Sequence, residues 1–144
     1  MPSLLDTRVE NTEIVQPNDT NIVDTAHGGT VVKWMDETGG ISAIRFAGNV
    51  CVTAGMESVD FHHPIHRGDA AVIRSYVYDV GTSSIDVRIC VYSENLKTGE
   101  RQLTTESYFT YVAIDDDGNP VEVPELEVET EKEKELRDEA LEGE

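Results

Sequence analysis

A single long apolar helix, set among strand-like segments, constrains the fold of this chain most. Between residues 29 and 47 the apolar positions nearly encircle a helix, which Gly48-Asn49 then ends. These positions are Val31, Val32, Trp34, Met35, Ile41, Ala43, Ile44, Phe46 and Ala47. A helix that is apolar on most sides is buried on most sides. Because the body of the chain contains no second helix of this kind, a sheet must surround it.

The remaining segments have the signals of strands. Residues 84–93 alternate cleanly between apolar and other side chains, and further strands are expected over residues 1–16, 51–61, 70–80 and 104–114. The order is therefore one strand, the helix, and four antiparallel strands. It predicts an α+β fold in which a curved antiparallel sheet of five to six strands wraps around one long central helix. An open edge of such a sheet invites pairing with a second copy of the chain.

The 144 residues are expected to form one domain over residues 1–124, followed by an acidic tail over residues 125–144. Beyond Pro120, eleven acidic residues face only Lys132, Lys134 and Arg137. Glu–Lys spacings favour a helix in the second half of the tail, but it lacks an apolar face. We therefore expect the tail to be solvated and flexible.

Charge and composition exclude several classes of function. The net charge of −18 opposes binding to nucleic acid or to an anionic membrane, because such binding depends on basic residues. An acidic surface with four lysines suggests adaptation to high salt, although an acidic protein from an ordinary source is the alternative. The sequence shows neither a signal-peptide pattern nor an apolar stretch long enough to span a membrane. Cys51 and Cys90 are interpreted as buried thiols, so we expect a cytoplasmic protein.

Asp36 is the candidate for chemistry within the helix. An isolated buried carboxylate is costly, so such a residue is either paired or functional. The glycines Gly39 and Gly40, three and four positions further on, would leave space beside it for a ligand. At the helix start, the N–H groups of Gly28 and Gly29 could stabilise developing negative charge. On these residues alone, an exposed Asp36 paired with Lys33 or Arg45 is an equal alternative.

Three histidines follow in the segment His62-His63-Pro64-Ile65-His66. In an extended segment neighbouring side chains point to opposite faces, and the helical i, i+4 spacing of many zinc sites is absent. We therefore expect no metal here and assign the segment to the wall of the site.

Several motifs together resemble one family. They are Pro17-Asn18-Asp19-Thr20-Asn21, His27-Gly28-Gly29, Lys33-Trp34-Met35-Asp36-Glu37, Phe61-His62-His63-Pro64-Ile65, Gly68-Asp69 and Phe109-Thr110-Tyr111-Val112-Ala113. In this order the chain resembles the hotdog-fold acyl-CoA thioesterases of the cytosolic acyl-CoA hydrolase type. The resemblance implies that Asp36 of one subunit and Asn21 of its neighbour are catalytic, and that the chain forms a dimer and then a hexamer of three dimers.

The expected activity is therefore hydrolysis of fatty acyl-CoA to a free acid and CoA, with no cofactor beyond the CoA of the substrate. The catalytic candidates are Asp36, Asn21, Gly28 and Gly29, and the candidates for substrate or CoA binding are His27, His63, Arg67, Ser83 and Ser84. The alternative is a non-catalytic acyl-CoA-binding or sensor protein on the same fold. A hotdog dehydratase is disfavoured because it would need a histidine on the helix, whereas His27 precedes it.

Overall fold

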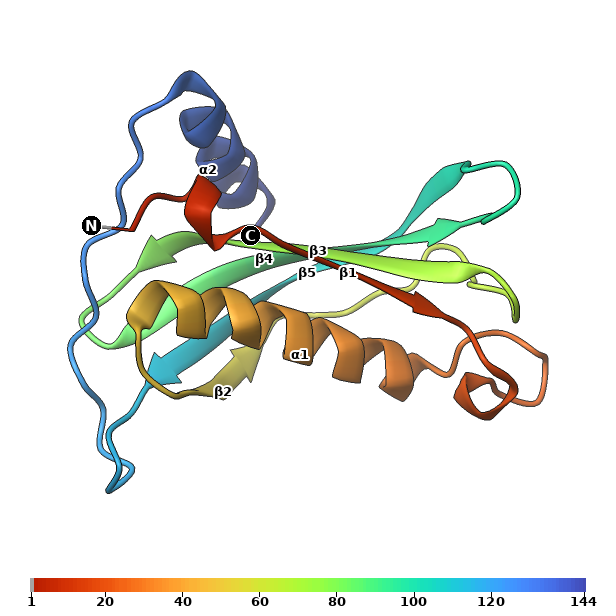
Figure 1. Ribbon diagram of the computed structural model, residues 1–144, viewed down its shortest axis with the longest axis horizontal. Helices are drawn as coiled ribbons and strands as arrows, with labels where there is room; N and C mark the ends of the chain where they lie inside the picture. Colours follow the sequence, from red (N-terminus) through yellow and green to blue (C-terminus); the bar gives the residue numbers. More distant parts are fainter. Residues whose placement is uncertain (1) are drawn as a thin grey trace.

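The computed structural model describes residues 2–144 as five strands and two helices (Figure 1). The strands are β1 (Val9–Ile14), β2 (Cys51–Met56), β3 (Ala70–Val80), β4 (Ser84–Glu94) and β5 (Arg101–Ala113). The helices are α1 (Gly28–Ala47) and α2 (Glu131–Gly143), and short 3-10 turns cover Leu5–Thr7 and Pro17–Asp19.

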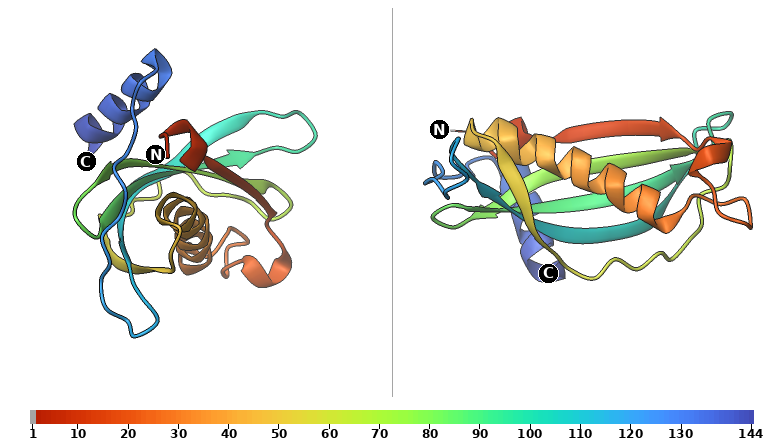
Figure 2. Two further views of the ribbon diagram at one scale, coloured as in Figure 1. Left: turned by 60° about the vertical axis from the view of Figure 1, so that its left-hand side comes forward. Right: turned by 90° about the horizontal axis from the view of Figure 1, so that it is seen from below.

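All five strands form one antiparallel sheet in the order β1-β3-β4-β5-β2. The sheet curves around α1, which lies against its concave face (Figure 2). This is the expected hotdog arrangement, with five strands. The strand expected over residues 51–61 ends earlier, at Met56, after which the chain leaves the sheet. Within residues 2–144, β1 and β2 each pair with a single neighbouring strand, so both are edges of the sheet.

The main core lies between α1 and the concave face of the sheet. Trp34 and Met35 of α1 pack there against the inward-facing side chains of β3, β4 and β5, as expected for core residues. Polar contacts also join α1 to β3 within this core: the hydroxyl groups of Ser42 and Ser75 lie 2.6 Å apart, and Ser75 also donates to the Thr38 carbonyl at 3.2 Å. These bonds satisfy buried hydroxyls and fix the helix against β3.

The helix is less completely buried than the sequence predicts. Ile41 and Ile44 have exposed fractions of 41% and 43%. The reason is geometric, because a sheet of five strands covers only one side of the helix. The other side of α1 leaves Ile41 and Ile44 open to solvent on the single chain, together with the charged Lys33, Glu37 and Arg45.

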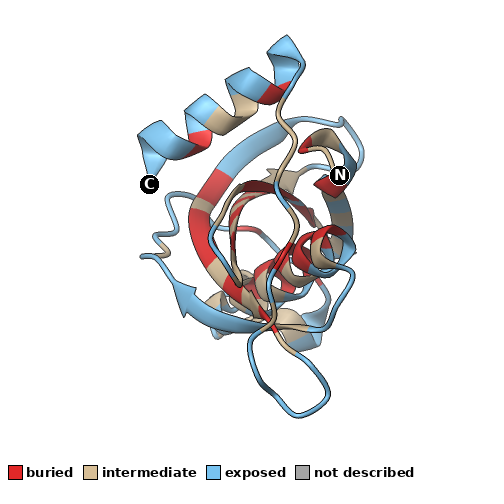
Figure 3. Cartoon of the chain, turned by 90° about the vertical axis from the view of Figure 1, so that its left-hand side faces the viewer, coloured by how far each residue is buried: buried red, intermediate tan, exposed pale blue. Residues whose placement is uncertain are grey.

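The acidic tail corrects a second expectation, because α2 packs on the convex face of the sheet (Figure 3). Ala140 is fully buried in a small cluster with Leu4, Tyr76, Tyr78 and Tyr108. Polar contacts supplement this small apolar surface: the Tyr76 hydroxyl donates to the Leu136 carbonyl at 2.6 Å. Neither α1 nor α2 has the length and apolar character needed to cross a membrane.

Candidate active site

Asp36 lies near the middle of α1, and two hydroxyl groups from the sheet hold its carboxylate. Thr53 donates to Oδ1 at 2.6 Å, and the Tyr111 hydroxyl lies 3.1 Å from the same oxygen. Thr53 of β2 and Tyr111 of β5 are directly paired across the two strands. A register shift follows between Thr53 and Gly55, and bulges of this kind often stand next to active sites. Asp36 itself is half-buried.

The Tyr111 side chain is 1% exposed and remains a hydrogen-bond donor at neutral pH. Burial, and then the neighbouring Asp36 carboxylate, raise the pKa of this phenol well above its ordinary value. The one proton of this hydroxyl is shared between Oδ1 and the Asp36 backbone carbonyl, which lies 2.9 Å from the phenol oxygen. Tyr111 therefore connects the sheet to both the backbone and the side chain of the candidate catalytic residue.

Gly39 has a different role from the one the sequence suggested. A Cβ at this position would lie 2.6 Å from the Tyr111 hydroxyl and 2.6 Å from Ile89 Cδ1. The space beside Gly39 is thus filled by sheet side chains and does not hold a ligand. At Gly40 a Cβ would meet only Tyr111 Cε1, at an ordinary 3.7 Å, so room beside Asp36 remains on that side.

The start of α1 offers one free amide where two were expected. His27 is the N-cap residue, and its Nδ1 accepts the Gly29 N–H at 3.2 Å. The Gly29 donor is therefore engaged in capping the helix. Gly28 N–H has no hydrogen-bond partner among residues 2–144, and the Phe61 ring lies beside it, 3.4 Å from where a Cβ would stand.

Gly28 and Asp36 of one chain are too far apart to act on one carbonyl group. They are eight residues apart in the same helix, which at 1.5 Å per residue is about 12 Å. An oxyanion donor must lie about 3 Å from the reacting oxygen. If the helix start and the carboxylate serve one reaction, they come from different chains.

Asn21 lies in the loop before α1, and its side chain organises that loop. Its amide nitrogen donates to Thr25 Oγ1 at 2.9 Å, and its Oδ1 accepts the Val23 N–H at 3.0 Å and the Thr25 N–H at 3.2 Å. The next two residues, Ile22 and Val23, have exposed fractions of 103% and 69%. Within one chain Asn21 is therefore apart from Asp36, on a loop whose apolar tip is open to solvent.

The candidate CoA-binding residues fall into two separate groups. The segment of residues 61–69 lies beside the Asn21 loop: Ala26 N–H donates to the Ile65 carbonyl at 2.7 Å, and Arg67 pairs with Asp24 at 3.2 Å. His63 and Arg67 are exposed in this segment. Within residues 2–144 no group of three or more His, Cys, Asp or Glu side chains is placed to hold a metal ion.

Ser83 and Ser84 lie at the opposite end of the sheet, where Ser83 ends the turn after β3 and Ser84 begins β4. The eleven residues of β3 separate them from the segment of residues 61–69, a span of about 33 Å. One chain therefore does not bring these serines together with His27, His63 and Arg67.

Thr53 and Tyr111 are the two site residues that the sequence did not identify. Each stands in a strand where threonine and tyrosine are ordinary residues. Both side chains reach Asp36 because of the pairing register between β2 and β5. No local sequence pattern predicts that register. The only hint was Tyr111 within the motif Phe109-Thr110-Tyr111-Val112-Ala113.

Comparison with known proteins gives a consistent family assignment. Residues 24–100 match the model of the thioesterase superfamily. An uncharacterized acyl-CoA thioester hydrolase of Bacillus subtilis, YkhA, is 43% identical over 136 residues, which cover 94% of this chain and 79% of that protein. A crystal structure of an apo-hexameric acyl-CoA thioesterase is 41% identical with a TM-score of 0.89, over 97% of this chain and 90% of that one.

An acyl-CoA hydrolase of Staphylococcus aureus, solved with butyryl-CoA and CoA, is 36% identical with a TM-score of 0.88, over 97% of this chain and 85% of that one. Structures of that hydrolase also exist with an asparagine, an aspartate or a threonine replaced by alanine. Those three positions are 15 and 17 residues apart, which is also the spacing of Asn21, Asp36 and Thr53 (21 to 36, 36 to 53).

Proposed function

Because this chain belongs to the thioesterase superfamily, we propose that it hydrolyses acyl-CoA to a free acid and CoA, with Asp36 as its central catalytic residue. The observation that carries the proposal is the carboxylate of Asp36, held on the helix by the hydroxyls of Thr53 and Tyr111. Two donors on one oxygen fix the orientation of the carboxylate. The matching spacing of the substituted residues in the Staphylococcus aureus hydrolase supports the same three positions.

We assign different roles to the two oxygens of Asp36 in this proposal. Oδ1 accepts from Thr53 and Tyr111, whereas Oδ2 has no hydrogen-bond partner within residues 2–144. Oδ2 is therefore available to take a proton from water, or to attack the acyl carbon directly. In the first route the resulting hydroxide adds to the thioester carbon. The C–S bond then breaks, and CoA leaves as the thiol with a proton returned to sulfur.

We place the complete site between two subunits. The Gly28 N–H and Asn21 of one chain would meet Asp36 of the other, since within one chain the helix start is about 12 Å from Asp36. A second copy would cover the open edge at β2 and the exposed Ile41 and Ile44 of α1. A dimer is then the smallest active unit, and the hexameric thioesterase described above suggests a trimer of dimers.

The same two-subunit arrangement would resolve the separation of the CoA-binding candidates. His27, His63 and Arg67 of one subunit and Ser83 and Ser84 of another could then contact one CoA. No cofactor is proposed, because CoA is part of the substrate. Cys51 and Cys90 are free thiols, which fits the reducing cytoplasm that we propose as the location.

The decisive experiment replaces Asp36 by asparagine and measures release of CoA thiol with a chromogenic thiol reagent. We expect turnover to fall by about a thousandfold or more, because the amide can neither accept the proton nor attack. The matched control is Glu37→Gln, which makes the same chemical change at the neighbouring exposed position and should leave turnover intact. Binding of CoA should persist in both variants.

Two outcomes would reject the proposal. Parent-like turnover by the Asp36→Asn variant would show that this carboxylate does no chemistry. Saturable binding of acyl-CoA by the parent protein with no thiol release would instead identify a non-catalytic acyl-CoA-binding protein. A panel from acetyl-CoA to palmitoyl-CoA, at low and at multimolar salt, would then define the acyl chain length and test the proposed adaptation to salt.

A further inference from the structure

One cavity of the chain lies on the convex face of the sheet, away from α1. It has a volume of about 550 Å³, within the range of small-molecule sites. Strands β1, β3 and β4 form its floor, and α2 forms one wall. The residues that line it are Arg8, Val9, Glu10, Arg74, Ser75, Tyr76, Arg88, Cys90, Tyr92, Lys132, Leu136 and Glu139.

The charge of this cavity is opposite to that of the chain as a whole. Four of the eleven basic residues line it, against the two carboxylates of Glu10 and Glu139, in a chain with a net charge of −18. Clefts lined mainly by one sign of charge concentrate ions of the other sign. In a chain with so many acidic residues, this basic cavity should therefore attract anions that the rest of the surface repels.

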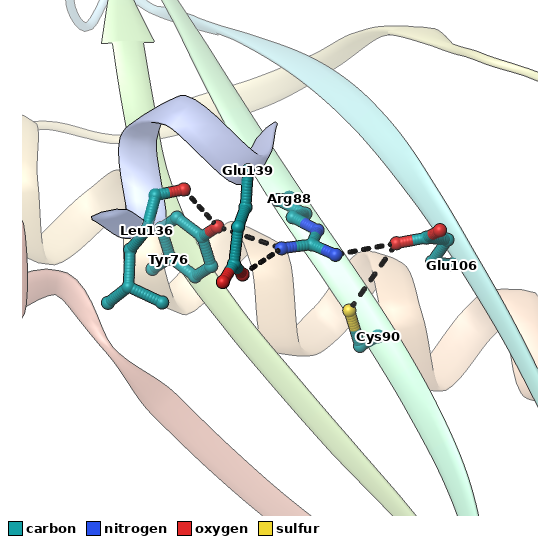
Figure 4. Close-up of polar contacts among 6 residues, drawn as sticks. All are labelled: Tyr76, Arg88, Cys90, Glu106, Leu136 and Glu139. Atoms are coloured by element: carbon teal, nitrogen blue, oxygen red, sulfur yellow. Dashed lines mark hydrogen bonds and ion pairs between the residues drawn. The ribbon is translucent and has the colours of Figure 1, made fainter. Parts of the chain in front are cut away.

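Arg88 lines this cavity with a side chain that is 17% exposed, and Figure 4 shows its polar contacts. Its Nη1 lies 3.2 Å from both the Tyr76 hydroxyl and Glu139, and its Nη2 lies 2.8 Å from Glu106. Its Nε is buried and has no hydrogen-bond partner within residues 2–144. Arg88 is thus held in place by Tyr76, Glu139 and Glu106, and its unpaired Nε–H lies beneath the cavity surface.

The other three cations are more open. Arg74 donates to Glu10 at 2.6 Å and lies 5.5 Å from the centre of the Tyr92 ring. Arg8 and Lys132 form no ion pair with a carboxylate among the described residues. Two cations are therefore available to an incoming ligand without first breaking an ion pair.

The sheet separates this cavity from the catalytic helix of the same chain. Arg74 and Tyr76 point to the convex side, whereas Ser75 between them contacts Ser42 of α1 on the concave side. A ligand in the cavity therefore does not contact Asp36 of its own chain.

We propose that this cavity is a binding site for a small phosphorylated anion. Phosphate oxygens suit several guanidinium and ammonium donors at once. Such a phosphate could belong to a free phosphate ester or to the nucleotide end of a CoA held by a neighbouring subunit. The shared chemistry is recognition of phosphate by the unpaired Arg8 and Lys132, with Arg74 and Arg88 beside them. The experiment below separates the two sources.

The test measures binding of inorganic pyrophosphate to the full chain by calorimetry, at constant pH and ionic strength. The parent protein should bind it saturably. Lys132→Gln should weaken binding about fivefold, as the loss of one exposed charge contact predicts. The matched control is Lys134→Gln, which removes the same charge two residues along α2, outside the cavity, and should leave affinity unchanged. Glu139→Gln should tighten binding, because it removes a carboxylate that competes for Arg88.

A second titration uses adenosine 3′,5′-bisphosphate and CoA as competitors. If both displace pyrophosphate, the site takes the nucleotide end of CoA; if neither does, it takes a free phosphate ester. The proposal is overturned if pyrophosphate does not bind saturably, or if Lys132→Gln and Lys134→Gln weaken binding equally. The Asp36→Asn variant should bind pyrophosphate as the parent does, so this result is independent of the proposed thioesterase activity.

Discussion

Alanine substitution at Gly39 and at Gly40 should change stability in opposite directions, although the two glycines are adjacent in α1. Alanine is favoured over glycine in a helix interior by about 1 kcal/mol. At Gly40 the added Cβ meets only Tyr111 Cε1 at 3.7 Å, so Gly40→Ala should gain most of that energy. For a domain of this size the melting temperature would rise by about 2–4 °C.

At Gly39 the same methyl group would lie 2.6 Å from both the Tyr111 hydroxyl and Ile89 Cδ1. Overpacking of this kind costs about 1–3 kcal/mol. After subtraction of the helical gain, Gly39→Ala should lose about 1 kcal/mol and lower the melting temperature. It should also reduce kcat about tenfold, because it displaces the hydroxyl that holds Asp36.

Thermal unfolding of both variants and of the parent provides the assay. The destabilisation by Gly39→Ala should be smaller in a Tyr111→Phe background, where one of the two close contacts is absent. Equal shifts of melting temperature at the two glycines, or a more stable Gly39→Ala variant, would refute the argument from close packing.

Three further predictions concern the hydrogen bonds of single side chains. Tyr111→Phe should reduce kcat about tenfold with little change in KM, since it removes one donor to Asp36; an unchanged kcat would contradict this role. Thr53→Val keeps the branched shape but removes the 2.6 Å bond to Asp36, and steady-state kinetics should show a similar loss. Backbone N–H groups of Leu5 and Thr130 lower the pKa of Glu133 from 4.5 to about 2. The Glu133 carboxylate therefore stabilises the folded protein above pH 4.5, and this contribution is lost as the pH falls towards 2. Glu133→Gln should therefore destabilise the protein by about 1 kcal/mol at pH 7, and chemical denaturation at pH 7 and pH 3 should find a smaller difference from the parent at the lower pH.

The main elements of the fold were predictable because their signals are local. The helix expected from residue 29 was found from Gly28 to Ala47, and Gly48, with φ of 68°, ends it in the left-handed conformation that favours glycine. The strand over residues 70–80 has the same bounds in the structure. Alternation and turn residues act over a few positions, so they can be read without the rest of the chain.

The packing of α2 was not predictable in the same way. Its apolar contribution to the interface is small, and ion pairs and hydrogen bonds supplement it, among them Arg88 with Glu139 and Arg137 with Asp79. A search for an apolar face does not detect such a surface. The acidic composition therefore suggested a solvated tail, whereas the convex face of the sheet supplies partners from β3 and β4.

The candidate site was predictable only in part, for a related reason. Asp36 stood out because a carboxylate in an apolar helix requires an explanation. Gly39 was misread because its neighbours, Tyr111 and Ile89, come from strands far away in the sequence. The engagement of the Gly29 amide by His27 is local, yet it depends on the rotamer of the histidine, which residue spacing does not determine.

The position of Thr53 has a consequence for regulation by assembly. This residue donates a hydrogen bond to the proposed catalytic carboxylate of Asp36, yet it stands on an edge strand whose outer backbone groups are free to pair with another strand. A subunit that binds along the free edge of β2 would also restrain Thr53. Dissociation of that subunit would leave Thr53 more mobile. Dilution would then inactivate the enzyme by dissociating its subunits, before any chain unfolds. The specific activity would therefore depend on the fraction of subunits that are assembled.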